Sequence, residues 1–433
     1  MRRNKILILG AGLAGLSTAY FLKKRKIASF LFEKESSCGG LCRSYKIDGF
    51  TFDISGHLLH FRNKHSLGLI KSILGNNLEK HKRKAYVYTF NRIIPYPFQL
   101  NFHYLPKEIS QKCLSGFIKA HNDGSGTKGN NFVEWSYYKF GKAITDYFMV
   151  PYNRKFWRFP LDKMHYKGIE KFIVIPKLRD IKRSISGRNR KNFGYSAFFW
   201  YPKEGGIEEL TKGLAAGIKT ICLNSEVTEV DLRKRTVKFS NGRNEQFDTL
   251  VSTVPLPELS RILKGLPLGI KNEFNKLKWL SIININFAVN KPIHPQSHWI
   301  YFPDRNVYFF RVGFFHNFST SLAPKNRGSI YVEVSYSGGN AGVRNIVGRV
   351  ENHLKKVGVI EDGVKIIHKS VDNIKYAYPI YDTNYQKSRS RILKFLSKNN
   401  IIACGRFGSW QYMSMEDVIL ESRKVSDFLY GKL

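Results

Sequence analysis

The sequence predicts an α/β protein in which a nucleotide-binding domain with a parallel sheet is assembled from separate parts of the chain. An apolar run at 6–9 leads into a Gly-x-Gly-x-x-Gly pattern at 10–15, which is typical of a buried strand followed by a tight turn and a helix. Strand-like segments at 224–230 and 248–254, and a strand and helix within 401–417, can rejoin this domain. We therefore expect a discontinuous Rossmann-type domain.

The three glycines of the N-terminal pattern each have a physical role. Gly10 permits the tight turn, Gly12 lets the backbone approach a pyrophosphate, and Gly15 allows close helix–strand packing. A helix over about 13–24 would direct its free N–H groups toward phosphates. Glu33 ends the next apolar run, where its carboxylate can accept hydrogen bonds from a ribose. A signal peptide is disfavoured because glycines interrupt the apolar stretch and no cleavage site follows it.

A second glycine pair favours FAD over NAD as the dinucleotide. Gly39 and Gly40, followed by Arg43, come shortly after the acid, where flavoproteins of the amine-oxidase type carry a glycine pair and an arginine. Two later segments with strand character, at 224–230 and 248–254, can return the chain to the nucleotide domain. Val227 lies in the first of them, and Gly405 lies in the C-terminal segment. Such an interleaved domain suits a flavoprotein better than a simple dehydrogenase. We expect all five residues to contact FAD.

The middle of the chain changes character twice. Residues 85–98 alternate like two strands around an Asn-Arg turn, and 104–190 have helical spacing, including a helix from 132 to 150 that Pro151 would stop. A mobile basic loop is expected at 189–194. Four strand-like segments follow within 280–336, and then a helix at about 345–357. The expected units are FAD-binding segments at 1–75, 196–265 and 386–433, substrate-domain strands at 76–103, a helical insert at 104–195 and an antiparallel substrate sheet at 266–385.

Composition limits the class of protein. The 433 residues can form two or three structural units, and 32 Phe, 23 Tyr and 6 Trp argue against disorder. No window offers the roughly 18 apolar residues of a spanning helix, so we expect a cytoplasmic protein. Five scattered cysteines are expected to be reduced. His57 and His60 lack further ligand residues, so no metal is expected.

The net charge of +38 leaves several partners open. The chain has no nucleic-acid-binding motif, and its lysines are spread along the whole sequence, so we expect no nucleic acid partner. Solvated lysine-rich faces account for the charge. An anionic substrate and peripheral contact with a membrane surface stay open as alternatives.

Segments along nearly the whole chain resemble the eukaryotic-type UDP-galactopyranose mutases and their bacterial relatives. The matching segments, in order, are SGHLLHF at 55–61, PYPFQ at 95–99, PYN–KFW at 151–157, YPKEGGI at 201–207, WIYFP–FFR–NFS across 299–319, YAYP at 376–379 and GRFGSWQY at 405–412. The resemblance implies FAD that is active as reduced FADH⁻ and a UDP-hexose substrate. In that family the flavin N5 attacks the anomeric carbon, and the resulting flavin–sugar adduct allows ring contraction.

The same resemblance implies roles for individual residues. Arg311 would pair with the diphosphate, where a planar guanidinium can grip two phosphate oxygens. His57 and Arg406 would lie beside the flavin ring, and Asp417 would open a final helix near the cofactor. The expected substrate contacts are Phe98, Gln99, Asn153, Trp157, Tyr301, Tyr378 and Tyr412. The resemblance also implies an external reductant such as NAD(P)H and a furanose product that serves as donor for polysaccharide or glycoconjugate synthesis. It is compatible with an oligomer.

Two departures from the family pattern keep alternatives open. A second family arginine near 171–173 is replaced by Lys171 and Phe172, and the family's Asn-Gln pair is replaced within 413–416. Lysine supplies charge without the bidentate fork, and the second change puts galactose itself in question. A true oxidoreductase of the amine oxidase or protoporphyrinogen oxidase type is the first alternative. A non-catalytic basic scaffold is the second.

Overall fold

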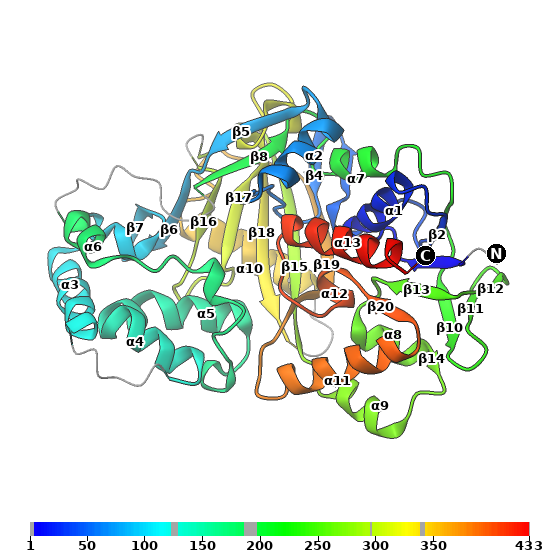
Figure 1. The fold of residues 1–433 in the computed structure, drawn as a ribbon. Coiled ribbons are helices and arrows are strands. Elements are labelled where there is room, and N and C mark those ends of the chain that lie inside the picture. Colours follow the sequence, from blue (N-terminus) through cyan, green and yellow to red (C-terminus); the bar gives the residue numbers. More distant parts are fainter. Residues whose placement is uncertain (1–3, 123–128, 186–196, 295–296, 338–342, 433) are drawn as a thin grey trace.

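A five-stranded parallel sheet forms the predicted nucleotide-binding region (Figure 1). The computed structural model describes residues 4–122, 129–185, 197–294, 297–337 and 343–432. Across the sheet the strands are β20 (Ile401–Ala403), β13 (Thr249–Ser252), β1 (Ile6–Leu9), β2 (Ser29–Phe32) and β9 (Ile221–Cys222). Every pairing in it is parallel. The discontinuous α/β architecture is confirmed, because segments from both halves of the chain share this sheet.

The first and last long helices pack against each other beside this sheet (Figure 1). Helix α1 (Leu13–Lys24) has the predicted bounds, and α13 (Met415–Tyr430) follows the short helix α12 (Gly405–Gly408). The Ser422 hydroxyl on α13 donates to the Ala14 carbonyl of α1 at 3.1 Å. Only small side chains allow so close an approach. The C-terminal strand and helix therefore complete the domain that the N-terminal glycines begin.

A seven-stranded sheet forms the second layer of the fold. Its strand order is β19 (Ile366–Pro379), β15 (Trp279–Val289), β18 (Gly328–Tyr336), β17 (Arg311–Phe314), β16 (Trp299–Tyr301), β6 (Ala85–Thr89) and β7 (Arg92–Pro95). All its pairings are antiparallel except that of β16 with β6. Helix α10 (Val343–Lys356) packs its apolar residues Ile346, Val350 and Leu354 into the core of this sheet. The antiparallel sheet is as predicted, whereas β19 was not expected.

The hairpin turn between β6 and β7 differs from the prediction by one residue. Phe90 and Asn91 form the turn with φ of 51° and 54°, and Arg92 already pairs with Thr89. A two-residue hairpin turn of this kind needs positive φ at both positions, which asparagine tolerates well. The predicted Asn-Arg turn is therefore wrong by one position.

The helical insert is present, but Pro151 does not end its helix. The helices are α3 (Lys107–Asn122), α4 (Phe132–Ile144), a π-helical turn (Thr145–Met149), α5 (Val150–Trp157) and α6 (Leu178–Ile185). Pro151 lies in the first turn of α5. Proline is tolerated there because its missing N–H would have no helical partner, and the wider π turn before it changes the backbone geometry. The predicted basic loop at 189–194 lies outside the described residues.

Smaller elements complete the fold. The segment predicted as a strand at 224–230 begins at Val227 and belongs to a separate sheet of β12 (Asn244–Gln246), β11 (Thr236–Phe239), β10 (Val227–Asp231) and β14 (Leu263–Lys264). It still contacts the nucleotide region, since the Ser225 N–H donates to the Glu33 carbonyl at 2.7 Å. Two ribbons pair β3 (Ser44–Ile47) with β4 (Phe50–Asp53) and β5 (Leu78–Lys82) with β8 (Phe198–Pro202). The other helices are α2 (Lys64–Leu74), α7 (Glu208–Ala215), α8 (Leu256–Ile262), α9 (Leu268–Asn275) and α11 (Tyr385–Lys398).

Candidate functional site

The two glycine segments lie against each other at the carboxyl end of β1. Gly12 forms a parallel bridge with Gly39, and the Gly39 N–H donates to the Ala11 carbonyl at 2.8 Å. A Cβ on Gly40 would lie 3.2 Å from the Gly12 Cα. A Cβ on Gly15 would lie 1.9 Å from the Gly10 carbonyl oxygen. Side chains at Gly15 and Gly40 would therefore meet the backbone of the same turn, which accounts for glycine at these two positions.

Glu33 supports this turn from the end of β2. Its carboxylate is buried and accepts hydrogen bonds from the Ala11 N–H at 2.6 Å and the Glu35 N–H at 3.0 Å. Arg43 donates to the Gly40 carbonyl at 3.1 Å. The acid that was predicted to receive a ribose thus also orients the glycine loop.

The C-terminal segment meets the same loop. Gly405 has a φ of 81°, and a Cβ there would lie 2.4 Å from the Ala14 Cβ. Its N–H donates to the Glu421 carboxylate at 2.5 Å. No side chain caps α1 at Gly12, and the first turn of α1 carries no acid. The uncapped helix end, with its positive dipole, is a suitable place for a phosphate group.

A cavity of about 160 Å³ lies between the helical insert and the seven-stranded sheet. Helix α5, strands β16, β17 and β19, and the segment after α12 contribute to its wall. The lining residues are Tyr96, Gln99, Phe148, Met149, Tyr152, Asn153, Phe156, Trp157, Ile169, Phe172, Ile173, Tyr301, Phe310, Arg311, Tyr378 and Tyr412. Seven of the eight predicted substrate contacts are in this set. Residues that are far apart in the sequence are therefore brought to one cavity.

Arg311 is the cationic residue in the cavity wall. It pairs across the hairpin with Tyr301 and forms an ion pair with the buried Glu333 on β18. The Glu333 carboxylate also accepts a hydrogen bond from the Ser55 hydroxyl. Burial alone would lower the pKa of Arg311, but the charge and hydrogen bond of Glu333, together with Tyr331 and Tyr378, outweigh this effect and hold that pKa well above its usual value. The guanidinium therefore stays charged and is held in one orientation.

Arg406 lies next to the cavity tyrosines. Its guanidinium carbon is 4.2 Å from the ring centroid of Tyr378 and 4.9 Å from that of Tyr412. It donates to the Ala377 carbonyl at 2.7 Å. These contacts fix the two tyrosines and the arginine as one unit.

Three further polar residues, Gln99, Asn153 and Trp157, line the cavity. The Trp157 indole donates to the Asn153 side-chain oxygen at 3.2 Å, and the Gln99 amide donates to the Val174 carbonyl at 2.5 Å. The Gln99 side-chain oxygen is buried with no hydrogen-bond partner among the described residues. Phe98, in contrast, lies outside the lining and stacks on Phe148 in the core, with ring centroids 5.1 Å apart. Gln99 is therefore better placed than Phe98 to read a ligand.

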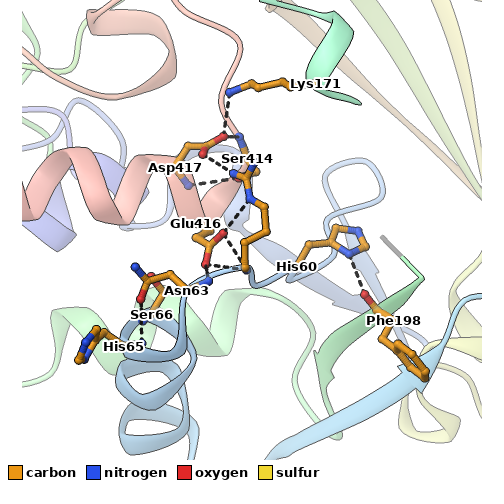
Figure 2. Close-up of polar contacts among 10 residues, drawn as sticks. His60, Asn63, His65, Ser66, Lys171, Phe198, Ser414, Glu416 and Asp417 are labelled. Atoms are coloured by element: carbon orange, nitrogen blue, oxygen red, sulfur yellow. Dashed lines mark hydrogen bonds and ion pairs between the residues drawn. The ribbon is translucent and has the colours of Figure 1, made fainter. Parts of the chain in front are cut away.

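The predicted cofactor residue Asp417 joins three segments of the chain, as Figure 2 shows in part. The Ser414 hydroxyl and the Asp417 carboxylate form a reciprocal cap at the start of α13. Asp417 also pairs with Arg62 at 2.6 Å and with Lys171 at 3.4 Å. Burial alone would raise the pKa of Asp417, but the Ser414 N–H and the two cations lower it overall. Lys171, where the resemblance implies an arginine, is thus paired with this acid.

Glu416 explains one departure from the family pattern. Its carboxylate is buried and is turned toward the start of α2 (Figure 2), where it accepts from the N–H groups of Arg62 at 3.0 Å and Asn63 at 2.9 Å. It is not part of the cavity lining. The replacement at this position therefore carries a structural role and gives no argument against a particular sugar.

Comparison with known proteins places the chain in a family. The sequence profile of the flavin-containing amine oxidoreductases matches residues 13–427. This chain belongs to that family. Family membership implies FAD as the cofactor, and the chain has the mixed α/β fold of these flavoproteins.

Individual proteins are similar to this chain over very different lengths. A crystal structure of reduced UDP-galactopyranose mutase is similar with a TM-score of 0.93 and 26% identity, over 99% of this chain and 96% of that one. A putative protoporphyrinogen oxidase from Exiguobacterium has a TM-score of 0.78 and 16% identity over the full length of both chains. A curated protein from the nifH2 3' region of Methanothermococcus thermolithotrophicus is 42% identical over 59 residues, which cover 14% of this chain and 57% of that relative. The chain thus spans little more than half of that curated relative.

The site of this flavoprotein fits FAD in three respects. The turn at Gly10, Gly12 and Gly15 carries no side chains, so a dinucleotide can approach its backbone, and the N-terminal end of α1 has no side-chain cap. Two buried nitrogens, His57 Nδ1 and Arg406 Nε, have no hydrogen-bond partner within the described part of the chain. Unpaired buried polar atoms are unfavourable unless a ligand satisfies them. Among the described residues, no cluster of three or more His, Cys, Asp or Glu could hold a metal ion, and no helix is long and apolar enough to cross a membrane.

His57 is expected to lower the free energy of unfolding of this flavoprotein at acid pH. Burial, followed by the charge of Arg406, lowers the pKa of His57 to about 4. Between pH 6.5 and pH 4, His57 binds a proton in the unfolded chain but not in the folded chain. The free energy of unfolding therefore decreases as the pH falls from 6.5 to 4. Between pH 7 and pH 4, wild type should lose about 3 kcal/mol more unfolding free energy than His57→Asn. Urea unfolding across this range measures the difference.

The matched control for this prediction is the exposed His65. His65→Asn should follow the wild-type pH dependence, because its ring is solvated in both states. If His57→Asn loses stability as steeply as wild type does, His57 is not the buried neutral base described above.

Glu416 is expected to matter for stability. Glu416→Ala should lower the free energy of unfolding by about 3 kcal/mol, because it leaves the N–H groups at the start of α2 without their acceptor. Glu416→Gln, which keeps one acceptor oxygen, should lose less. Equilibrium denaturation measures both changes, and the exposed Glu361→Ala serves as the control. Equal stabilities for Glu416→Ala and Glu361→Ala would contradict this role.

Glu333 is the main site residue that the sequence interpretation missed. It is the single acid in the apolar stretch SIYVEVSY and is almost fully buried. A carboxylate inside such a strand needs a partner. The lone acid in this apolar strand could therefore have been predicted to pair with Arg311. Tyr96 and Tyr152 also line the cavity without having been named, because isolated tyrosines on such segments resemble ordinary core residues.

Proposed function

We propose that this chain is a FAD-dependent mutase of nucleotide-activated sugars, which interconverts the pyranose and furanose forms of a UDP-hexose. The observation that carries the proposal is the convergence of Arg311 with Tyr301, Tyr378 and Tyr412 on one cavity, next to Arg406. An amine or an apolar substrate needs no such arrangement. A diphosphate does, since it requires positive charge together with neutral donors.

The cavity residues would divide the work on a UDP-hexose. Arg311, held by Glu333, would bind the diphosphate and stabilise its charge as the bond to the sugar breaks. The tyrosines would add hydrogen bonds without adding charge. Gln99, with its unpaired oxygen, would read the base edge, while Asn153 and Trp157 would form the wall beside it. The similarity to a reduced UDP-galactopyranose mutase over nearly the whole chain supports this assignment.

The cofactor would lie along the glycine segments, and its ring would lie near His57 and Arg406. Reduced FAD, when bound, supplies the nucleophile for the anomeric carbon. His57 would accept or donate one hydrogen bond as a neutral imidazole. The residues we assign to the cofactor are Gly10, Gly12, Gly15, Glu33, Gly39, Gly40, Arg43, Val227, Gly405 and Asp417. An external reductant such as NAD(P)H would prepare the cofactor, and the furanose product would serve polysaccharide or glycoconjugate synthesis.

The test is a direct assay of the reduced protein. The purified holoprotein is reduced with dithionite and incubated with UDP-galactopyranose or UDP-galactofuranose, and the products are separated by chromatography. Interconversion only in the reduced form supports the proposal and identifies the sugar. If UDP changes the flavin spectrum but neither sugar is converted, a UDP-sugar is still the proposed substrate, and other UDP-sugars are tested. The absence of any response to UDP overturns the proposal.

A second candidate is a FAD-dependent oxidoreductase of the amine oxidase or protoporphyrinogen oxidase type. The apolar part of the cavity lining, from Phe148, Met149, Phe156, Ile169 and Phe310, favours it. Such an enzyme would reduce its flavin with an amine or an apolar substrate and would be reoxidised by oxygen. Anaerobic bleaching of the oxidised flavin by such a compound, without any effect of UDP, would make this the leading candidate.

A further inference from the structure

One buried lysine lies in the wall between the helical insert and the seven-stranded sheet. Lys155 is on α5 and is only 8% exposed. Its ammonium donates to the carbonyl of Phe302 at 2.7 Å, to that of Phe309 at 3.2 Å, and to that of Asp304. Burial lowers the pKa of Lys155 to about 7. A lysine is rarely buried unless its ammonium is paired or hydrogen-bonded, as it is here by three carbonyls.

The three carbonyls belong to the connection between β16 and β17. Phe302 directly follows Tyr301, and Phe309 comes two residues before Arg311. Tyr301 and Arg311 are opposite each other in the β16–β17 pairing. The ammonium therefore holds both ends of the loop that carries these two cavity residues.

Helix α5 carries the facing wall of the same cavity. Asn153, Phe156 and Trp157 line it from this helix, next to Lys155 in the sequence. The Phe156 ring also contacts Phe310 edge-on, with centroids 5.0 Å apart. Ring packing alone lets two surfaces slide, whereas three hydrogen bonds from one charged group fix their register.

We infer that Lys155 is a positioning residue that sets the distance between the α5 wall and the β16–β17 wall, and through it the placement of Arg311 and Tyr301. The inference rests on the proposed function, since it makes binding of the nucleotide diphosphate depend on this ammonium. Lys155 itself does not line the cavity and acts through the hairpin.

The test compares Lys155→Met with Lys163→Met, which makes the same change at an exposed position. UDP affinity is measured on the oxidised holoprotein by flavin absorbance, and hydrogen–deuterium exchange is followed in peptides covering 300–312. Lys155→Met should bind UDP about tenfold to a hundredfold more weakly, because a small displacement of the guanidinium is costly. It should also exchange faster in that peptide while keeping its flavin. Lys163→Met should match wild type in each respect.

The outcomes separate this inference from the proposed function. Wild-type UDP affinity and wild-type exchange in Lys155→Met would overturn the inference. If wild type itself does not respond to UDP, the proposed function fails, and exchange at 300–312 alone decides whether Lys155 holds the hairpin. If Lys155→Met loses its flavin, Lys155→Arg is used instead. That variant keeps the charge, so it should bind flavin and show slow exchange in peptides covering 300–312. Its UDP affinity should stay below that of wild type. Wild-type UDP affinity in Lys155→Arg would overturn the spacing role.

A double-mutant cycle measures the coupling between Lys155 and Arg311 in UDP binding, which a purely structural role of Lys155 would not produce. In an Arg311→Lys background, Lys155→Met should weaken UDP binding by much less than it does in wild type, because both changes act on the same contact. Equal effects in the two backgrounds would show that Lys155 does not act through Arg311.

Discussion

Replacing Arg311 by alanine is expected to weaken UDP binding at least about a hundredfold and to abolish turnover of a UDP-hexose. The guanidinium is the cation that the cavity wall offers to a diphosphate, and it is held in place by Glu333. Arg311→Lys should retain part of the affinity, because it keeps the charge but loses the planar fork. Titration of the oxidised flavin with UDP measures all three proteins.

The same substitution leaves Glu333 as an unpaired charge in the interior. We expect Arg311→Ala to lower the free energy of unfolding by about 3–5 kcal/mol. The double variant Arg311→Met/Glu333→Gln removes both charges and should recover much of that stability without recovering UDP binding. The exposed Arg261→Ala is the matched control and should change neither property. Wild-type UDP affinity in Arg311→Ala would make the mutase assignment untenable.

Gly15→Ala is expected to abolish FAD binding. The added Cβ would lie 1.9 Å from the Gly10 carbonyl oxygen and 3.3 Å from Leu31 Cδ1. The first of these is backbone within the cofactor turn, so the turn or the start of α1 has to move. We expect the purified variant to carry less than about a tenth of the wild-type flavin, measured by absorbance after denaturation.

The matched control for this change is Gly68→Ala. Gly68 is also within a helix, and a Cβ there would meet nothing within 4 Å. It should keep its flavin and gain up to about 1 kcal/mol of stability, because alanine favours the helix. Stoichiometric flavin in Gly15→Ala would mean that the glycine spacing does not define the cofactor site.

The nucleotide region was predictable because its signals are local. The apolar run of β1, the glycine spacing and the apolar face of α1 lie within twenty residues of one another. Each corresponds to one backbone requirement. The helical insert and the strands from β15 to β18 were predictable for the same reason, since their periodicity is continuous.

Features that depend on distant partners were harder to predict. The burial of β19 alternates along the strand, but its less exposed face includes His368, Ser370 and Asp372, so the sequence shows no alternation of apolar and polar residues there. Pro151 is compatible with helix because it lies in the first turn of α5, directly after a π turn. The resemblance placed Phe98 at the ligand, whereas packing against Phe148 buries it in the core. The placement of Arg311 opposite Tyr301 was not visible before the hairpin register was known.

The position of β1 between β2 and β13, with β20 beyond β13, has a consequence for biosynthesis. The sheet that carries the glycine loop gains its last strand and its covering helix only when residues 401–430 have left the ribosome. Contacts between residues so far apart in sequence form slowly. A nascent chain would therefore leave the outer edge of β13 unpaired until residues 401–430 have been translated, and flavin would be loaded only once this segment is available.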